Sequence, residues 1–252
     1  MKPLLEVKNL TKIFKKKGQE DLSAVDHVSF SLYPGETLGI VGESGSGKST
    51  VARAVTGLLA ATEGEIYLQE QEIRGLPGRK FREICGKFQM VFQSPAASFD
   101  PRRTLGDGIG ESLKNAGMPR KERRARVEEL LRRCGLAGEY ADRYPHEVSG
   151  GECQRAAIAR ALAIRPELLI CDEATSALDV TVQRQILELL AELKREQGMS
   201  YLFICHDLAL VQQFCDRVLV MESGRIVEEG TPEEVILHPR TEYTRRLVEA
   251  VL

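Results

Sequence analysis

Residues 42–50 read GESGSGKST and have the composition and spacing of a phosphate-binding loop. The run fits the pattern G-x-x-x-x-G-K-[ST], with Gly42, Gly47, Lys48 and Ser49 in its fixed places. Glycines let the backbone bend around an anion without a Cβ in the way, so that successive N–H groups and the next helix N-terminus face it. Lys48 can reach the outer phosphates of a nucleotide, and the Ser49 hydroxyl can ligate Mg²⁺.

The alternative is a glycine-rich turn that matches this pattern by chance. At average residue usage a chain of 252 residues matches about one time in a hundred. The run also follows an expected strand at 37–41 and opens an expected helix at 48–59, which is the context the motif requires. We therefore expect nucleotide binding here.

A second group of residues has the chemistry for a metal and a water molecule. The run ELLICDE at 167–173 is an apolar strand that ends in two acids. Beside a phosphate loop, Asp172 can hold Mg²⁺ through its water shell, and Glu173 can orient the attacking water. Alone, an acidic pair after a strand is more often a solvated turn, but downstream of a phosphate loop the functional interpretation is favoured.

Two single polar residues complete the candidate site. Gln93 follows an expected strand at 88–92 and can sense the metal and the water. His206 follows an expected strand at 201–205 and can contact the terminal phosphate. Each is weak evidence alone, because a turn glutamine is usually solvated and a lone histidine is more often structural.

These residues need a sheet whose strands end at one edge. Hydrophobic patterning predicts strands at 4–14, 24–32, 37–41, 65–68, 88–92, 168–171, 201–205 and 217–221, and helices at 48–59, 120–133, 181–196 and 208–214. The alternation of strand and helix predicts an α/β fold with a mostly parallel sheet covered by helices. The charged middle predicts a helical subdomain at about 95–160, and the tail from Pro232 is expected to be helical with a break at His238-Pro239.

Composition narrows the class of protein. The formal net charge is −2, which argues against nucleic acid as the main partner because nucleic-acid binding usually needs a basic surface. No apolar run reaches the roughly 20 residues that span a bilayer, and the N-terminus has no signal-peptide core, so we expect a cytoplasmic chain. None of the six cysteines forms a C-x-x-C pair, so Cys171 and Cys205 are expected to be buried free thiols.

The segment from Ser149 to Leu162, SGGECQRAAIARAL, places two glycines before an expected helix. A helix N-terminus of this kind can form a second anion site. The alternative is a serine N-cap followed by flexible glycines.

The order of these motifs resembles the ATP-binding-cassette (ABC) ATPase family over nearly the whole chain. The resemblance implies a single ABC ATPase domain at 1–252, with a mixed-sheet catalytic core and an antiparallel β subdomain (1–94 and 161–230), an α-helical subdomain with the signature (about 95–160) and a helical tail (231–252). It implies catalysis by Glu173, His206 and Gln93, and Mg²⁺ binding by Ser49, Gln93 and Asp172. It assigns ATP binding to Phe14, Gly42, Glu43, Ser44, Gly45, Ser46, Gly47, Lys48, Ser49, Thr50, Ser149, Gly150, Gly151 and Glu152.

In that family Phe14 falls where an aromatic ring stacks on adenine, 176–179 (SALD) form the D-loop, and the signature contacts the γ-phosphate held by a second cassette. The usual LSGGQ is VSGGE here, with Val148 and Glu152, and an acid near a phosphate weakens that half-site by repulsion. We expect the Ser and Gly backbone to do most of the work, so that activity is little affected. The histidine lies in CHD rather than the commoner SHD, which we expect to matter little.

The subfamily is similar to the dipeptide, oligopeptide and nickel importers. The residues that carry this likeness are FQSPAASFDPR, YPHEVSGG, DEATSALDV and the tail HPRTEYTRRLVEAV. The longer peptide-importer subunits often carry a cysteine cluster near the C-terminus, and its absence here favours the nickel or metallophore-like members. The resemblance implies permease subunits, a second identical or paralogous cassette and, indirectly, an extracytoplasmic solute-binding protein as partners, at the cytoplasmic face of the membrane.

Two other functions were weighed against an importer ATPase. A soluble cassette acting on DNA or the ribosome predicts a long coiled-coil insert or two cassettes, and this sequence has one cassette and no heptads. A cassette that binds ATP only as a structural clamp predicts a missing acid or histidine, but Glu173 and His206 are both present. The transported solute is not readable from this sequence.

Overall fold

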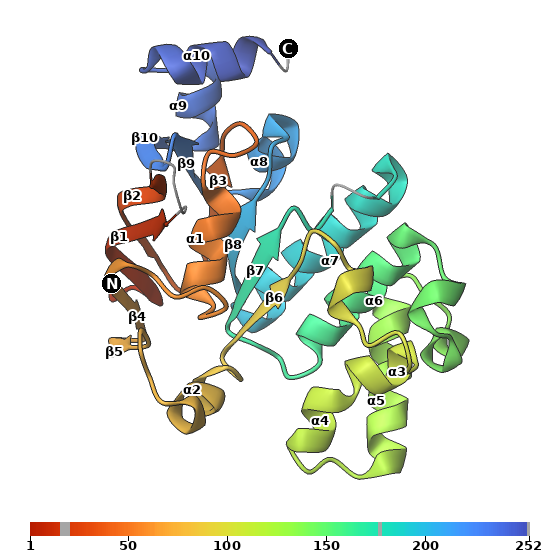
Figure 1. Ribbon diagram of the computed structural model, residues 1–252. Helices are drawn as coiled ribbons and strands as arrows, with labels where there is room; N and C mark the ends of the chain where they lie inside the picture. The colour runs from red at the N-terminus through yellow and green to blue at the C-terminus, as the bar shows by residue number, and fades with distance from the viewer. Residues whose placement is uncertain (16–20, 176–177, 251–252) are drawn as a thin grey trace. The chain divides into compact units, whose positions relative to one another are not determined.

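The computed structural model describes residues 1–15, 21–175 and 178–250 (Figure 1). The chain forms two compact units. The first comprises Met1–Cys85 and Gly198–Leu252, and the second comprises Gly86–Gln197. The predicted division into catalytic core, helical subdomain and tail stays a prediction.

An antiparallel sheet in the first unit has the strand order β2-β1-β4-β5. Its strands are β1 (Leu5–Phe14), β2 (Leu22–Leu32), β4 (Glu63–Leu68) and β5 (Gln71–Glu72). Leu5 pairs with Leu32 at one end of the β1–β2 ladder, and Phe14 pairs with Leu22 at the other. Leu5, Val25 and Leu32 are fully buried, because the sheet turns one face to the core.

The other sheet strands of the first unit carry the phosphate-loop motif. In the order β10-β9-β3-β8 these are β10 (Arg225–Gly230), β9 (Arg217–Glu222), β3 (Thr37–Val41) and β8 (Ser200–Ile204). Strand β3 is parallel to β8 and β9, and β10 is antiparallel to β9. Every residue of β3 and β8 is buried, which is why both read as unbroken apolar runs rather than as alternating patterns.

The helices of the first unit are α1 (Lys48–Val55), α2 (Gly78–Ile84), α8 (Leu208–Phe214), α9 (Pro232–Leu237) and α10 (Glu242–Glu249). The predicted helix at 48–59 is too long, because α1 ends at Val55. Thr56 Oγ1 donates to Ala52 O at 3.0 Å and to Arg53 O at 3.2 Å, and Gly57 then takes a left-handed conformation with φ 70°. The predicted break at His238-Pro239 is confirmed, since it separates α9 from α10.

The second unit pairs β6 (Phe88–Val91) with the parallel strand β7 (Leu168–Asp172). Its helices are α3 (Leu105–Ile109), α4 (Glu111–Asn115), α5 (Arg120–Arg133), α6 (Gly150–Leu162) and α7 (Val180–Gln197), with short 3₁₀ turns at Ala96–Ser98, Gly138–Asp142 and Pro145–Glu147. Helix α5 has the predicted bounds, and it buries the predicted apolar face of Val127, Leu130 and Leu131.

Mixed strand directions, an antiparallel sheet and flanking helices confirm the predicted fold class. All six cysteines are free thiols, and Cys171 and Cys205 are buried as predicted. Within the described ranges no helix is both long and apolar enough to cross a membrane.

Candidate functional site

The loop between β3 and α1 is held by its own lysine. Lys48 Nζ donates to Gly42 O and Glu43 O, each at 2.7 Å, and to Ser46 Oγ at 3.2 Å. The lysine is 5% exposed, so its charge is withdrawn from bulk water and placed against carbonyl oxygens. These bonds fold the loop back over the ammonium group, and they place the cation where an anion in the loop would meet it.

The two fixed glycines of the loop are required by packing. Gly42 has φ 149°, and a Cβ there would lie 2.2 Å from Met221 O. Gly47 has φ 106°, and a Cβ there would lie 2.3 Å from Ala24 O. Both backbones therefore approach their neighbours closer than any side chain permits.

Helix α1 presents a bare N-terminus to the loop. In the described part of the chain no side chain caps this helix, whose N-cap is Gly47, and its first turn holds no acidic residue. The first N–H groups of a helix have no partner inside it and carry the positive end of its dipole. The arrangement favours a phosphate group.

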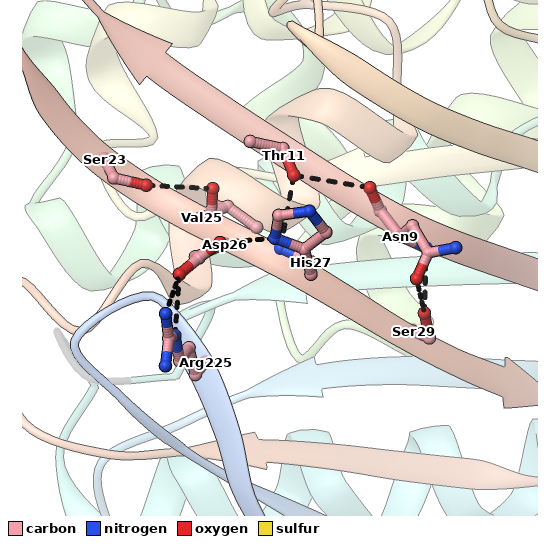
Figure 2. A network of polar contacts seen from close by, with 8 residues as sticks. All are labelled: Asn9, Thr11, Ser23, Val25, Asp26, His27, Ser29 and Arg225. Atoms are coloured by element: carbon pink, nitrogen blue, oxygen red, sulfur yellow. Dashed lines mark hydrogen bonds and ion pairs between the residues drawn. The ribbon is translucent and has the colours of Figure 1, made fainter.

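A turn between β9 and β10 fixes the loop from another side. Gly224 N–H donates to Ser46 O at 3.0 Å, and Gly224 O accepts from Asp26 N–H at 2.9 Å. Figure 2 shows the side chain of Asp26 on β2 reaching Arg225 in this turn, with Arg225 Nε 2.6 Å from Asp26 Oδ2. His27 Nδ1 lies 2.5 Å from Asp26 Oδ1. The hydrogen bonds from His27 and then Arg225 lower the pKa of Asp26, so this ion pair is intact at neutral pH.

His206 lies at the same edge of the first unit's sheet as the phosphate loop. Ile40 of β3 is in register with Ile204 of β8, and the chain turns after each strand. His206 is exposed, and Asp207 caps α8 by accepting from Ala209 N–H at 2.8 Å. The position agrees with the predicted contact to a terminal phosphate, which stays a prediction.

Phe14, the predicted adenine-stacking residue, is the last residue of β1. Its side chain is 38% exposed, and Lys12 Nζ lies 5.0 Å from the ring centroid. The partly exposed ring makes a cation–π contact with this ammonium group, and its predicted stacking on adenine stays a prediction.

The second unit brings together three of the predicted residues. Val91 of β6 is in register with Cys171 of β7, so the residues that follow these parallel strands are neighbours. Gln93 Nε2 donates to Glu173 Oε2 at 2.5 Å. Asp172 is buried, at 1% exposure, and Glu173 has a left-handed backbone with φ 49°. A non-glycine residue in that conformation costs about 1–3 kcal/mol and is typical of functional sites.

The signature residues form the start of α6, also in the second unit. Ser149 is the N-cap, and its Oγ accepts from Glu152 N–H at 3.3 Å. Glu152 Oε2 accepts from Ser149 N–H at 2.8 Å, and Glu152 Oε1 accepts from the Tyr140 hydroxyl. Tyr140 and then the Ser149 backbone lower the pKa of Glu152. Glu152 is thus bonded in a capping box and stays ionised at neutral pH, so the expected repulsion of phosphate stays a prediction.

Sequence patterns missed several residues that support these groups. Gln154, 1% exposed on α6, donates to Phe92 O at 3.4 Å, directly before Gln93. Tyr243 in the tail accepts from Glu43 N–H of the phosphate loop at 2.9 Å. Both residues lie in segments that the sequence singles out, the signature and the tail, but only a three-dimensional contact reveals either role. Ser176 and Ala177 of the predicted D-loop lie outside the described residues.

A glycine-rich loop closed by its lysine, followed by a helix N-terminus, together with an acidic strand end, defines a P-loop nucleotide-binding ATPase of the α/β class. The family model described as "ABC transporter" matches residues 25–176. The chain belongs to the ABC transporter family.

Curated relatives and solved structures agree with this assignment. The chain is 48% identical to the oligopeptide transport ATP-binding protein OppF of Escherichia coli, over 99% of this chain and 78% of that protein. It is also 48% identical to the glutathione import ATP-binding protein GsiA of Escherichia coli K12, over 99% of this chain but 41% of that protein's length. The structure matches the ATP-binding cassette MJ0796, in a dimeric post-hydrolysis state bound to ADP and Pi, with a TM-score of 0.85, 32% identity and coverage of 90% of this chain and 98% of that chain.

Removal of the loop's cation should weaken nucleotide binding. Lys48→Ala is expected to raise the Kd for ATP roughly tenfold to a hundredfold, because charge-assisted hydrogen bonds to phosphate are lost. Isothermal titration calorimetry measures this change, with Lys80→Ala on the exposed face of α2 as the control. Equal affinity in Lys48→Ala and the wild type would contradict the assignment.

The ion pair behind the loop should make stability depend on acid. The pKa of Asp26 is lowered in the folded chain, so its contribution is present above the unfolded value of about 4 and is lost as pH falls further. Asp26→Asn should therefore be less stable than the wild type in urea at pH 7, and the difference should shrink below about pH 4. Glu70→Gln, which removes the exposed pair with Lys2, is the control with little effect at either pH. A difference that stays constant from pH 7 to pH 3 would refute the role of the charge.

Proposed function

We propose that this chain is the ATP-binding and ATP-hydrolysing subunit that energises an ABC importer, with hydrolysis coupled to solute translocation. The closed phosphate loop, with Lys48 bonded to Gly42 O and Glu43 O, carries the proposal. The names of the relatives support the importer, since OppF and GsiA are both import or transport ATP-binding proteins.

In this proposal the first unit binds ATP. The N–H groups of the loop and of the first turn of α1 receive the phosphates, and Phe14 stacks on the adenine ring. To reach a phosphate oxygen, Lys48 must exchange part of its bonding within the loop. Its bond to Ser46 Oγ is the longest of the three described, so we expect that one to yield first. His206 contacts the terminal phosphate.

The second unit supplies groups for metal and water. Asp172 and Gln93 of this unit offer the oxygen ligands that Mg²⁺ prefers, as Ser49 does in the first unit, and the buried carboxylate of Asp172 fits a cation site. When bound, Mg²⁺ neutralises charge that develops on the phosphates. Glu173 orients and polarises the attacking water. Its bond to Gln93 holds the carboxylate in one place, so a change at Gln93 would also move the base.

The signature acts on a second cassette. Ser149 caps α6, and Gly150 and Gly151 are its first residues, so the backbone N–H groups of the two glycines lie at the open end of the helix and can donate to a γ-phosphate. We infer that Glu152 stabilises this turn, because its carboxylate already accepts from Ser149 N–H and Tyr140. The second cassette is an identical or a paralogous chain.

The remaining partners follow from the importer. We propose transmembrane permease subunits as direct partners and a solute-binding protein as an indirect one, with this chain at the cytoplasmic face of the membrane. The printed solutes of the relatives are oligopeptides and glutathione. These solutes favour a peptide as the transported solute. The sequence alone favoured nickel or a metallophore, because it lacks the cysteine cluster of the longer peptide-importer subunits.

Hydrolysis and uptake should fail together when the base is removed. In the complex reconstituted in liposomes, Glu173→Gln should bind ATP but lower hydrolysis about 10²-fold to 10⁴-fold, because general-base catalysis is lost. Uptake of a radiolabelled oligopeptide should cease in parallel, while Glu188→Gln on α7 should behave as the wild type. Hydrolysis at the native rate would refute the role of Glu173, and nickel uptake without peptide uptake would refute the proposed solute.

Association should depend on the signature. With hydrolysis blocked by Glu173→Gln, ATP should convert the chain from a monomer to a dimer with itself or with a paralogue, as measured by light scattering. Adding Ser149→Arg should abolish the dimer and spare ATP binding, because a bulky cation fills the anion site. Thr104→Arg removes another N-cap, on α3, and should leave the dimer intact. A monomer with full ATPase activity would contradict the composite site.

A further inference from the structure

The C-terminal tail reaches the phosphate loop through one hydroxyl. Tyr243, on the first turn of α10, is 7% exposed, and its oxygen accepts from Glu43 N–H at 2.9 Å. The same residue of the loop offers its carbonyl to Lys48 Nζ at 2.7 Å. Glu43 is therefore held at its N–H by the tail and at its C=O by the lysine.

The tail is itself fixed by a buried acid. Glu228 on β10, 7% exposed, accepts from Arg240 N–H at 2.9 Å and from Thr241 N–H at 3.1 Å. Thr241 is the N-cap of α10 and accepts from Thr244 N–H at 3.1 Å. These bonds set where α10 begins, so they set where the ring of Tyr243 lies.

We propose that Tyr243 is a positioning residue of the nucleotide site. By holding Glu43 N–H it keeps residues 42–44 in the conformation in which Gly42 O and Glu43 O receive Lys48, and it thereby prepares the loop for phosphate before ATP arrives. A loop that is ordered in advance binds more tightly, because less conformational entropy is lost on binding. In this proposal the tail, 231–250, contributes to ATP binding through the position of Tyr243. The inference rests on ATP binding at this loop, as proposed above.

The test removes the hydroxyl and keeps the ring. Tyr243→Phe should raise the Kd and KM for ATP about threefold to tenfold, the worth of one uncharged hydrogen bond, and leave kcat near the wild-type value. Amide hydrogen exchange of Glu43 should become faster in the variant. Neither change is expected of a residue that only adds to overall stability.

Two further variants sharpen the result. Tyr67→Phe removes a hydroxyl from β4 that bonds to Glu65 Oε2, so it is the matched control and should leave affinity and Glu43 exchange unchanged. Glu228→Gln should reproduce part of the effect of Tyr243→Phe, because it loosens the start of α10 and leaves the ring intact. If a variant unfolds at a lower temperature than the wild type, its Glu43 amide exchange is measured at a temperature at which the variant is still folded.

The outcomes separate this inference from the proposed function. If wild-type chain binds ATP and Tyr243→Phe binds it equally well, the positioning role is wrong, whether or not exchange at Glu43 changes. If Tyr67→Phe weakens binding as much as Tyr243→Phe does, the effect is not specific to the loop and the role is also wrong. If the wild-type chain itself does not bind ATP, the proposed function fails first.

Discussion

A buried ammonium group must be matched by oxygen atoms, and the phosphate loop of this chain is shaped by that requirement. Lys48 is nearly inaccessible to water, and the carbonyls of Gly42 and Glu43 compensate for the lost hydration. The loop can supply these carbonyls only if its backbone bends tightly, which explains the positive φ values at Gly42 and Gly47. The neighbouring strands pack so closely against the loop at these two positions that only glycine fits.

The same requirement explains why two other segments of the first unit form hydrogen bonds to the backbone of the loop. The β9–β10 turn donates to Ser46 O, and the tail accepts from Glu43 N–H. The lysine bonds to both of the residues that these supports hold, at Glu43 O and at Ser46 Oγ. The second unit repeats the principle with opposite charge, since the amide of Gln93 bonds the carboxylate of Glu173 in a strained backbone conformation. In each unit a charged side chain is fixed by neutral amides or carbonyls, which orient a charge without cancelling it.

The sequence predicts the parts of this arrangement that are local. The phosphate loop, the acidic strand end after β7 and the bounds of β3, α5 and α8 follow from spacing and periodicity, because each depends on neighbouring residues alone. Sequence patterns overextend α1, since the hydroxyl of Thr56 and the left-handed Gly57 end it, and they miss the strands β5 and β10. The bonds that hold Glu152 could not be read from the signature alone, because one of them comes from Tyr140, twelve residues away. The supports of the loop could not be predicted, because Tyr243 and Glu43 meet only in the folded chain, 200 residues apart.

The burial of Cys171 in β7 and of Cys134 after α5 determines how these thiols react with oxidants. Burial raises the pKa of Cys171 to about 12 and that of Cys134 to about 12. Both thiols are therefore protonated at neutral pH, and the thiolate is the form that oxidants and alkylating agents attack. Cys171, buried in the strand that ends in Asp172, is therefore shielded from peroxide and electrophiles while the chain stays folded. Oxidative damage to these two thiols becomes a marker of unfolding.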